Sequence, residues 1–577
     1  MNRHFGVTSD VLLGILARVL QLILPTVFLT GGYLMADTSL TDRARSFVAA
    51  HEAKFLPLDR RAGLAWWNAN VSGKDEDFAE KEAAQNAIDT ALADPKAFAE
   101  LKILKEAAAK GQIDDQVVRR CIDVLYLLYL EKQVNPDLLK KIVSKSNAVE
   151  KTFNTFRADL NGKQMTDSEV RKVLKQSLDS KERQQVWSAS KVVGKKVLRD
   201  LTELVHLRNE AARQLGFKNY HAMQLFLNEQ DGDELIRLFD ELDELTRQPF
   251  RAAKAEIDAA LAKQYGIPIS DLMPWHYHDP FFQESPALFA DLDAPYKNAD
   301  ILQLCRSFYS GIGLPIDDVL SRSDLYEKPG KSPHAFCTDI DRSGDVRVLA
   351  NIVPNEYWMS TMLHELGHAV YSSKNIPARL PYVLRSESHI LTTEGVAMLF
   401  EKFSKSRAWI QKMGLRLDNP REFETAARKI NQNQLLIFSR WCQVMLRFEK
   451  SMYENPEQDL NKLWWDLVER YQEIRRPTGR NEPDFASKIH IVSAPVYYHN
   501  YMMGQLFASQ VFDKIVKELY PNQNPNDVSF VGDSRVGAFM KQKVFAPGKL
   551  YDWRQLTRFA TGADLNAKAF ASEFQTR

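Results

Sequence analysis

The sequence predicts a mainly α-helical protein with a small antiparallel sheet. Turn-forming residues are scarce, because the 577 residues include only 25 Gly and 24 Pro, whereas average usage of about 12% would give roughly 69 together. Apolar residues recur at three- and four-residue spacing along most of the chain, a pattern typical of helices that are buried on one side. Strand-like runs are few, and the clearest is Val346–Ile352.

Five long segments carry the helical pattern, and many of them are rich in the good helix formers Ala, Leu, Lys and Glu. They are Ser39–Ala62, Phe78–Gln112, Asp115–Glu131, Ser180–Leu215 and Asp233–Tyr265. Residues 166–169 and 230–233 offer Thr, Asp and Gly where helices begin. The stretches Pro268–Pro295 and Leu314–Pro333 are predicted to be loops inside the fold. No repeat or linker divides the chain after its N-terminal segment, which predicts one large domain.

Composition excludes several classes of protein. Apolar residues make up 45% and charged residues 26% of the chain, as in ordinary soluble globular proteins. A net charge of +1, from 76 basic against 75 acidic side chains, argues against a nucleic-acid partner. The four cysteines form no Cys-x-x-Cys motif, so we expect buried thiols, although disulfides stay open. They are Cys121, Cys305, Cys337 and Cys442.

Residues 1–36 are predicted to be a signal peptide or an N-terminal anchor. Basic residues, among them Arg3 and Arg18, precede the apolar run Val19–Leu29, as in a secretory signal. This predicts a secreted or periplasmic protein that contacts a membrane only through such an anchor. The alternative is that translation begins at Met35, which would make the protein cytoplasmic.

The most informative segment contains His364, Glu365 and His368. On a helix, positions four apart lie on one face, so the two imidazoles can bind one Zn²⁺ while Glu365 takes a proton from a metal-bound water. Asn355, after a proline, is a candidate N-cap for this helix. The competing interpretation is two unrelated histidines on a buried helix.

A catalytic zinc needs a third protein ligand and one open position. The extended motif with a third histidine is excluded, because Tyr371 and Lys374 occupy the Gly and His positions. A carboxylate on the next predicted helix, residues 386–405, is the usual alternative. Spacing alone does not choose among its candidates, which are Glu387, Glu394 and Glu401.

Several segments, in the same order along the chain, resemble the angiotensin-converting enzyme family, which are zinc peptidyl-dipeptidases of the gluzincin type. The resemblance extends from about Ser39 to beyond Gln505 and fits a distant, bacterial-type member. The matching segments are Leu207–Phe217, His334-Ala335 with Asp339, His364–His368, Thr393–Gly395, Trp464-Trp465, Arg470–Gln472, Lys488 with His490, and Pro495 with Tyr498 and Tyr501.

The resemblance implies a fold, a cofactor and the third ligand. The fold would be a large helical ellipsoid split by a deep central cleft, with the small sheet near the zinc helix and helices from residues 39–112 as a lid. Residues 37–577 would form a single zinc metallopeptidase domain in two halves. One Zn²⁺ per chain would be held by His364, His368 and Glu394.

The resemblance also implies roles in catalysis and binding. Glu365 would be the general base, and Tyr501 with His490 would stabilise the developing oxyanion. The substrate-binding residues would be His334 and Ala335, which hold the peptide extended, and Lys488 and Tyr498, which bind its C-terminal carboxylate. The tyrosine register stays open, because Tyr497 also lies seven residues after His490, as in the family.

Five positions depart from the family pattern. Tyr277 replaces a glutamine of the carboxylate-binding trio, so that part of the anchor is expected to be changed. Asn500 and Val468 replace two chloride-site arginines, which makes chloride activation doubtful. Met398 replaces an aspartate that supports a zinc histidine, so that contact must come from elsewhere. Pro333 replaces a cysteine, which removes one of the family's disulfides.

The function that the resemblance implies is hydrolysis of short peptides, with release of C-terminal dipeptides. The first alternative is an oligoendopeptidase that cuts inside short peptides, since 274–283 and 498–504 have some character of those relatives. The second is a peptide-binding homologue without catalysis. Such a protein would be expected to have lost Glu365 or a zinc ligand, and all of them are present here.

Overall fold

A computed structural model describes residues 39–286 and 292–575. The residues from Leu40 onward form one compact unit. The predicted signal or anchor at 1–36 lies outside the described residues. Within the described ranges, none of the helices combines the length and the apolar character needed to cross a bilayer.

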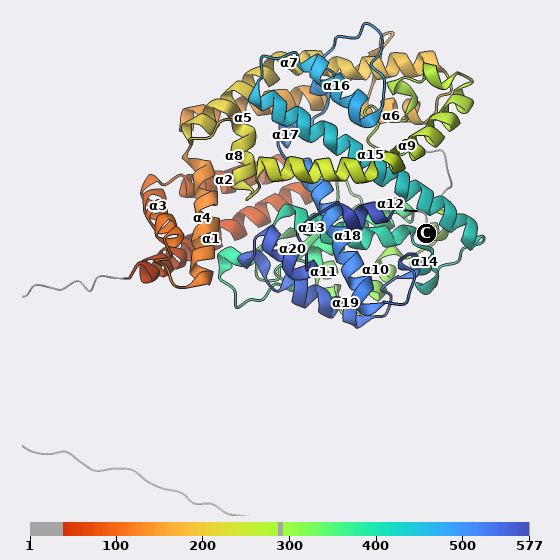
Figure 1. Cartoon of the computed structure of the whole chain (residues 1–577). Helices are drawn as coiled ribbons and strands as arrows, with labels where there is room; N and C mark the ends of the chain where they lie inside the picture. Colours follow the sequence, from red (N-terminus) through yellow and green to blue (C-terminus); the bar gives the residue numbers. More distant parts are fainter. Residues whose placement is uncertain (1–38, 287–291, 576–577) are drawn as a thin grey trace, which may run out of the picture. The chain divides into compact units, whose positions relative to one another are not determined.

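Helices make up most of the described chain (Figure 1). The α-helices are α1 Leu40–Ser72, α2 Asp75–Leu92, α3 Pro95–Ala109, α4 Gln116–Leu130, α5 Pro136–Thr155, α6 Asp167–Gln176, α7 Ser180–Gln214, α8 Tyr220–Leu227, α9 Gly232–Tyr265, α10 Ile301–Gly311, α11 Asp317–Arg322, α12 Glu356–Val370, α13 Ile390–Glu401, α14 Arg407–Lys412, α15 Pro420–Glu454, α16 Leu460–Gln472, α17 His490–Ser493, α18 His499–Leu519, α19 Ser534–Phe539, α20 Trp553–Thr561 and α21 Lys568–Ser572.

Short turns and two hairpins complete the fold. The 3₁₀ turns are η1 Glu131–Gln133, η2 Ile269–Asp271, η3 Pro274–His276, η4 Ala294–Tyr296, η5 Tyr382–Leu384, η6 Lys402–Lys405, η7 Asp484–Ser487, η8 Pro525–Asp527 and η10 Gly548–Leu550, and η9 Met540–Phe545 is a π-helical turn. The strands are β1 Ala158–Leu160, β2 Lys163–Met165, β3 Phe336–Asp339 and β4 Val346–Leu349.

The prediction of a mainly α-helical fold is confirmed. Its errors concern where individual helices begin and end. The pattern over 78–112 is two helices, because the Asp94 side chain caps the backbone N–H groups of Lys96 and Ala97 and Pro95 opens α3. The first helix runs ten residues past Ala62, to Ser72. Thr166 and Asp231 cap α6 and α9, as their sequences indicate.

Smaller features also differ from expectation, although the expected free thiols are confirmed. The loop expected at 314–333 contains helix α11, and the loop at 268–295 contains the turns η2 to η4. The hairpin β1–β2 was not foreseen, because each of its strands has only three residues. All four cysteines are free, and Cys337 is only half-buried whereas the other three are buried.

The hairpin β3–β4 lies directly before α12 in the chain. Its strands are antiparallel, with Phe336 opposite Leu349 and Asp339 opposite Val346. The predicted strand Val346–Ile352 is therefore correct in place but ends at Leu349. Within the described ranges β3 pairs with β4 alone, and β3 packs against α12. The second edge of β3 is therefore available near the candidate zinc helix.

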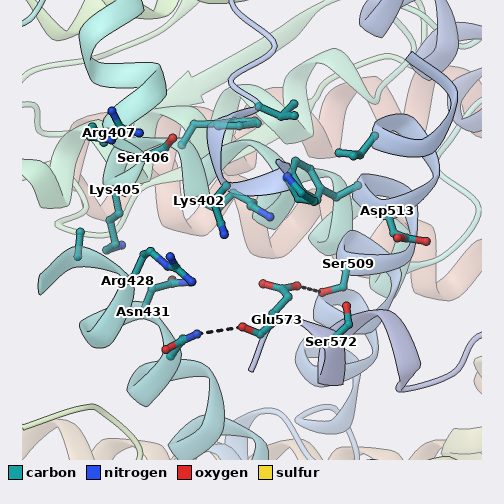
Figure 2. A pocket seen from close by; sticks show the side chains of 18 of the residues that line it. Lys402, Lys405, Ser406, Arg407, Arg428, Asn431, Ser509, Asp513, Ser572 and Glu573 are labelled. Atoms are coloured by element: carbon teal, nitrogen blue, oxygen red, sulfur yellow. Dashed lines mark hydrogen bonds between the residues drawn. The ribbon is translucent and has the colours of Figure 1, made fainter. Parts of the chain in front are cut away.

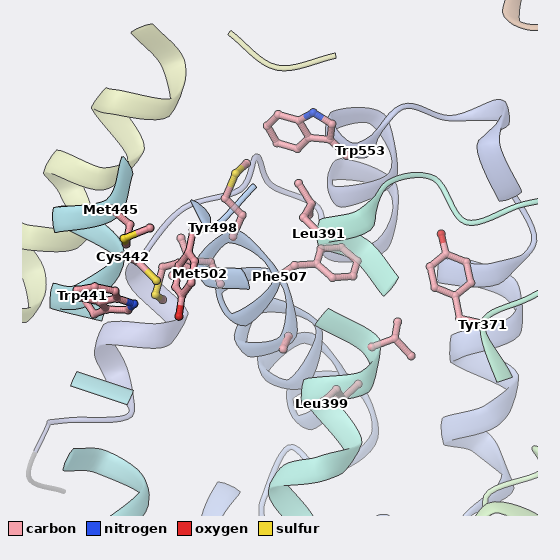
Figure 3. Close-up of a cluster of buried hydrophobic side chains, with 14 of the residues drawn as sticks. Tyr371, Leu391, Leu399, Trp441, Cys442, Met445, Tyr498, Met502, Phe507 and Trp553 are labelled. Carbon is pink, nitrogen blue, oxygen red and sulfur yellow. The ribbon is translucent and has the colours of Figure 1, made fainter. Parts of the chain in front are cut away.

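Helix α13 packs between α12 and α18 at glycine contacts. A Cβ atom on Gly367 would lie 2.7 Å from Cα of Ala397, and a Cβ atom on Gly395 would lie 2.7 Å from the carbonyl oxygen of Gly504. Buried apolar side chains fill the surroundings of α13 and α18, Leu391 and Phe507 among them (Figure 3). The three helices therefore approach more closely than side chains at these positions would allow.

This packing predicts that Gly395→Ala destabilises the protein. The added methyl group would overlap backbone and the Phe507 ring, and overpacking of this kind costs about 1–3 kcal/mol. Thermal unfolding should show a lower midpoint. The control is Gly232→Ala at the start of α9, where the new Cβ would meet only a side-chain atom of Leu225 at 3.6 Å. An equal midpoint for both variants would contradict the close packing of α13 on α18.

Candidate active site

Two histidines on α12 direct ring nitrogens toward each other. Asn355 begins the helix, because its side-chain oxygen accepts the backbone N–H of Trp358 at 2.8 Å. One turn separates His364 from His368, and their Nε2 atoms lie 3.1 Å apart. Two nitrogens at this separation on one helix face can ligate one ion.

Glu394 of α13 completes a group of three metal-ligand side chains. Its Oε2 atom lies 3.6 Å from Nε2 of His364 and 4.0 Å from Nε2 of His368. Ligands at zinc bond lengths in a tetrahedral site are about 3.4 Å apart, so the three atoms surround a space of the right size. Two His and one Glu also suit zinc chemically.

Two further side chains orient the histidine rings from behind. The Nδ1 atom of His364 is hydrogen-bonded to the carboxylate of Glu401, and Nδ1 of His368 lies 2.7 Å from Oγ1 of Thr393. These contacts fix each ring with Nε2 facing the third ligand. The family pattern has an aspartate that supports one histidine, but Met398 occupies that position here. Glu401 and Thr393 provide such support instead.

Glu387, the remaining candidate third ligand, is outside this group. Burial raises the pKa of Glu387 to about 7, and its neighbouring charges are Asp339, Lys549 and Arg342 rather than the two histidines. Sequence spacing had left three glutamates equivalent. The structure places Glu394 beside the Nε2 atoms and Glu401 behind one ring.

Glu365 is buried next to the histidine pair. Burial raises the pKa of Glu365 to about 7; the charge of His364 opposes this rise and that of Glu394 adds to it. The backbone of Cys337 on β3 hydrogen-bonds to this carboxyl group. A carboxyl group with a pKa near neutrality can both take and return a proton.

His334 and Ala335 lie immediately before β3. His334 is exposed and Ala335 half-buried, so both can contact a molecule in solution. Since the outer edge of β3 has no strand partner among the described residues, an extended peptide can add there by backbone hydrogen bonds.

Lys488 lies in an aromatic enclosure. Its Nζ atom donates a hydrogen bond of 2.7 Å to Oε1 of Gln283. The same atom lies 5.4, 5.2 and 5.3 Å from the ring centres of Phe281, Trp441 and Tyr498. Burial lowers the pKa of Lys488 to about 8. The Lys488 amine, the Gln283 amide and the Tyr498 ring therefore lie next to one another.

Gln283 lies beside Lys488, a contact that the sequence did not indicate. Tyr277 was expected to leave the anchor without its glutamine. The Tyr277 hydroxyl instead donates to Asp258 and accepts from Lys254, both at 2.9 Å. Gln283, six residues further along, provides the amide beside Lys488. Sequence reasoning missed this residue, because position 277 is the one that follows the matching tryptophan.

The tyrosines after His490 divide between two environments. Tyr498 packs on His490, with ring centres 5.1 Å apart, and faces Lys488. Tyr497 and Tyr501 contact each other, with ring centres 5.2 Å apart. For both of them, burial and then the charge of Glu394 raise the pKa, to about 12 for Tyr501. Tyr498 rather than Tyr497 therefore occupies the position beside the lysine.

His490 remains neutral at physiological pH. Burial, with the nearby charge of Lys488, lowers the pKa of His490 to about 4. Its buried Nδ1 atom has no hydrogen-bond partner among the described residues. A neutral imidazole with an unused ring nitrogen can hydrogen-bond to a bound ligand.

Comparison with known proteins agrees with these motifs. The profile of the family described as angiotensin-converting enzyme matches residues 38–276 and 285–576. The angiotensin-converting enzyme-like protein Ace3 of Mus musculus is 21% identical over 447 residues, which cover 71% of this chain and 59% of that protein. The angiotensin-converting enzyme of Bos taurus is 22% identical over 421 residues, covering 66% and 31%. The chain thus spans about three fifths of the first relative and under one third of the second.

The site geometry predicts that Glu394→Ala depletes the protein of zinc and that Glu387→Ala does not. Glu394 is the only one of these two carboxylates near both Nε2 atoms, and loss of one of three ligands leaves an incomplete site. Elemental analysis after dialysis against sub-stoichiometric zinc measures this. Zinc loss in Glu387→Ala with retention in Glu394→Ala would move the third ligand to Glu387.

Proposed function

The chain belongs to the angiotensin-converting enzyme family, and on that premise we propose that it is a zinc-dependent peptidase that releases dipeptides from the C-termini of short peptides. The observation that carries the proposal is the pairing of two features in one chain. His364, His368 and Glu394 form a metal-ligand group. Lys488 lies in a polar and aromatic enclosure suited to a carboxylate.

The chemistry at the reacting bond requires an ion and a base. Zinc held by His364, His368 and Glu394 would supply polarisation of a water molecule and of the scissile carbonyl. Glu365 takes the proton of the attacking water and returns it to the leaving amine, a role suited to its pKa near 7. Glu401 and Thr393 hold the histidine rings in place.

Hydrogen-bond donors stabilise the charge that develops on the carbonyl oxygen. The Tyr501 hydroxyl keeps its proton at neutral pH, because the pKa of Tyr501 is about 12, and it can donate to that oxygen. Neutral His490 provides a second donor nearby. Neither Tyr501 nor His490 is positively charged. The zinc ion would therefore supply the positive charge that stabilises the carbonyl oxygen, together with the hydrogen bond from the Tyr501 hydroxyl.

Peptide binding uses a strand edge and a charge. His334 and Ala335 align the substrate along β3 in an extended form. Lys488, with Gln283 and Tyr498, binds the free C-terminal carboxylate through charge-assisted hydrogen bonds. Anchoring the end of the peptide fixes which bond reaches Glu365, and the family pattern sets that bond two residues from the end.

A second candidate function is internal cleavage of short peptides. One observation favours it: Lys488 already donates to Gln283, so its position does not by itself require a substrate carboxylate. Under this alternative the same ion and the same base would act, and only the choice of bond would differ.

Product analysis of one unstructured decapeptide, with a free or an amidated C-terminus, tests the proposal. We expect chelator-sensitive loss of C-terminal dipeptides from the free acid only, because the amide offers no charge to Lys488. Mass spectrometry identifies the products. The Glu365→Ala variant is the inactive control, expected to retain zinc and lose turnover. Equal internal cleavage of both peptides would instead establish the oligoendopeptidase function, and no turnover of any peptide would support the non-catalytic homologue.

The lowered pKa of Lys488 predicts a pH dependence. Below about pH 8 the amine is charged and binds the substrate carboxylate; above it the amine is neutral and this contact weakens. For free-acid substrates kcat/KM should therefore fall above about pH 8, mainly through KM, whereas amidated substrates should lack this fall.

Lys488→Met should abolish the alkaline fall and raise KM roughly tenfold or more, the usual value of a hydrogen bond to a charged group. Exposed Lys462→Met is the matched control. An unchanged alkaline fall in Lys488→Met would remove Lys488 from substrate binding.

A further inference from the structure

A separate cavity of about 170 Å³ lies beside the turn η6, which directly follows α13. Its wall is built by η6, α15, α18 and the segment that follows α21 (Figure 2). None of the predicted catalytic, metal or substrate-binding residues lines it. The space is several times the roughly 30 Å³ that one water molecule occupies in the liquid, so it can hold a small organic molecule.

Two cations border this cavity without a carboxylate partner. Nζ of Lys402 lies 3.5 Å from the ring centre of Phe512, and neither Lys402 nor Arg428 makes a hydrogen bond or ion pair through its side chain with any described residue. The other cations of the wall are paired, Lys405 with Glu356 at 3.1 Å and Arg407 with Glu424 at 2.8 Å. Lys402 and Arg428 are thus the two cations of the wall without a direct ion pair; the charge of Glu573 acts on half-buried Lys402, and Arg428 is exposed.

One carboxylate, that of Glu573, borders the same cavity without a direct ion pair to a described residue, although its charge acts on Lys402. Oε1 of Glu573 accepts the Ser509 hydroxyl at 2.6 Å, and the Glu573 backbone carbonyl accepts the Gln432 amide at 2.9 Å. These two bonds fix the Glu573 side chain in the wall, where it forms no ion pair with a described residue. Figure 2 shows Lys402, Arg428 and Glu573 on different sides of the space.

Lys402 and Glu573 are half-buried, and a charge without a direct ion pair in a partly enclosed site costs free energy that a ligand of opposite charge offsets. Burial lowers the pKa of half-buried Lys402, and the charge of Glu573 opposes this shift. A ligand that satisfies all three side chains must carry one negative and one positive group. It also needs an apolar part, because Phe403, Phe512 and Val516 form the rest of the wall.

We propose that this cavity binds the zwitterion of an α-amino acid or a dipeptide. The ligand carboxylate lies between Lys402 and Arg428, its ammonium group pairs with Glu573, and its side chain contacts Phe512 and Val516. The proposal depends only on the charges and shape of this cavity and is independent of the proposed peptidase activity.

The position of the cavity links it to the candidate zinc helices. Lys402 directly follows Glu401, whose carboxylate holds His364. In the same turn, the Ser404 hydroxyl donates to Glu356 at 2.7 Å, which ties η6 to the first residue of α12. A ligand at Lys402 therefore lies next to η6, which is joined to α13 and hydrogen-bonded to α12.

Calorimetric titration of the full chain with phenylalanine and with alanyl-phenylalanine tests the proposal. We expect saturable binding of at least one, and the tighter ligand identifies the source as a free amino acid or a dipeptide. N-acetyl-phenylalanine and phenylalanine amide, which each lack one charge, should bind at least tenfold more weakly. Lys402→Met and Arg428→Gln should each weaken binding at least tenfold, and Glu573→Gln should remove the preference for a free amine.

Matched controls separate this site from the candidate active site. Lys412→Met and Arg421→Gln, both exposed and outside the cavity, should leave binding unchanged, and Lys488→Met should leave unchanged the binding that Lys402→Met removes. Should Lys402→Met fail to fold, Lys402→Arg keeps the charge and should keep binding. Equal affinity for the zwitterion and its acetylated or amidated form, or loss of binding in Lys488→Met instead of Lys402→Met, would overturn the proposal.

Discussion

The candidate site depends on the close approach of three helices. The two histidines on α12 can provide two ligands at most, and the third arrives from α13. That approach needs a glycine at position 367, where a Cβ atom would lie 2.7 Å from the backbone of Ala397. On the other side of α13, Gly395 and Gly504 allow α18 to approach, and Tyr501 lies one turn before Gly504. The candidate metal ligands and the candidate tyrosine donor therefore lie on helices whose close approach depends on glycines rather than on loops.

Burial of negative charge gives the site its chemical character. Glu365, Glu394 and Glu401 surround the histidine pair, and burial raises the pKa of Glu365 and of Glu394. Carboxylates held together out of water are unfavourable unless a cation joins them. A bound divalent ion is the strongest local charge such a site can acquire. Burial would lower the pKa of His364, but Glu401 raises it to about 9, so a metal ion binding at its Nε2 atom would displace a proton.

Local pattern predicted the helices and the histidine pair, because both depend on residues within one or two turns. Capping by Thr166, Asp231 and Asn355 could be predicted for the same reason. The break before Pro95 was missed although its signal, Asp-Pro, is present in the sequence. Contacts between distant segments could not be predicted: Lys488 meets Gln283 across 205 residues. Likewise, spacing alone could not show that Glu401 lies behind a histidine while Glu394 lies in front of it.

The first turn of α18 shows how a departure from the family pattern is accommodated. Where the family has an arginine, Asn500 accepts the Gln230 amide at 2.7 Å, and Gln230 accepts from His499 at 2.8 Å. Burial lowers the pKa of His499 well below its usual value, so this network is neutral. Neutral hydrogen bonds thus hold the turn between Tyr498 and Tyr501. Tyr498 therefore lies beside Lys488, and Tyr501 lies near the charge of Glu394, although position 500 is not an arginine.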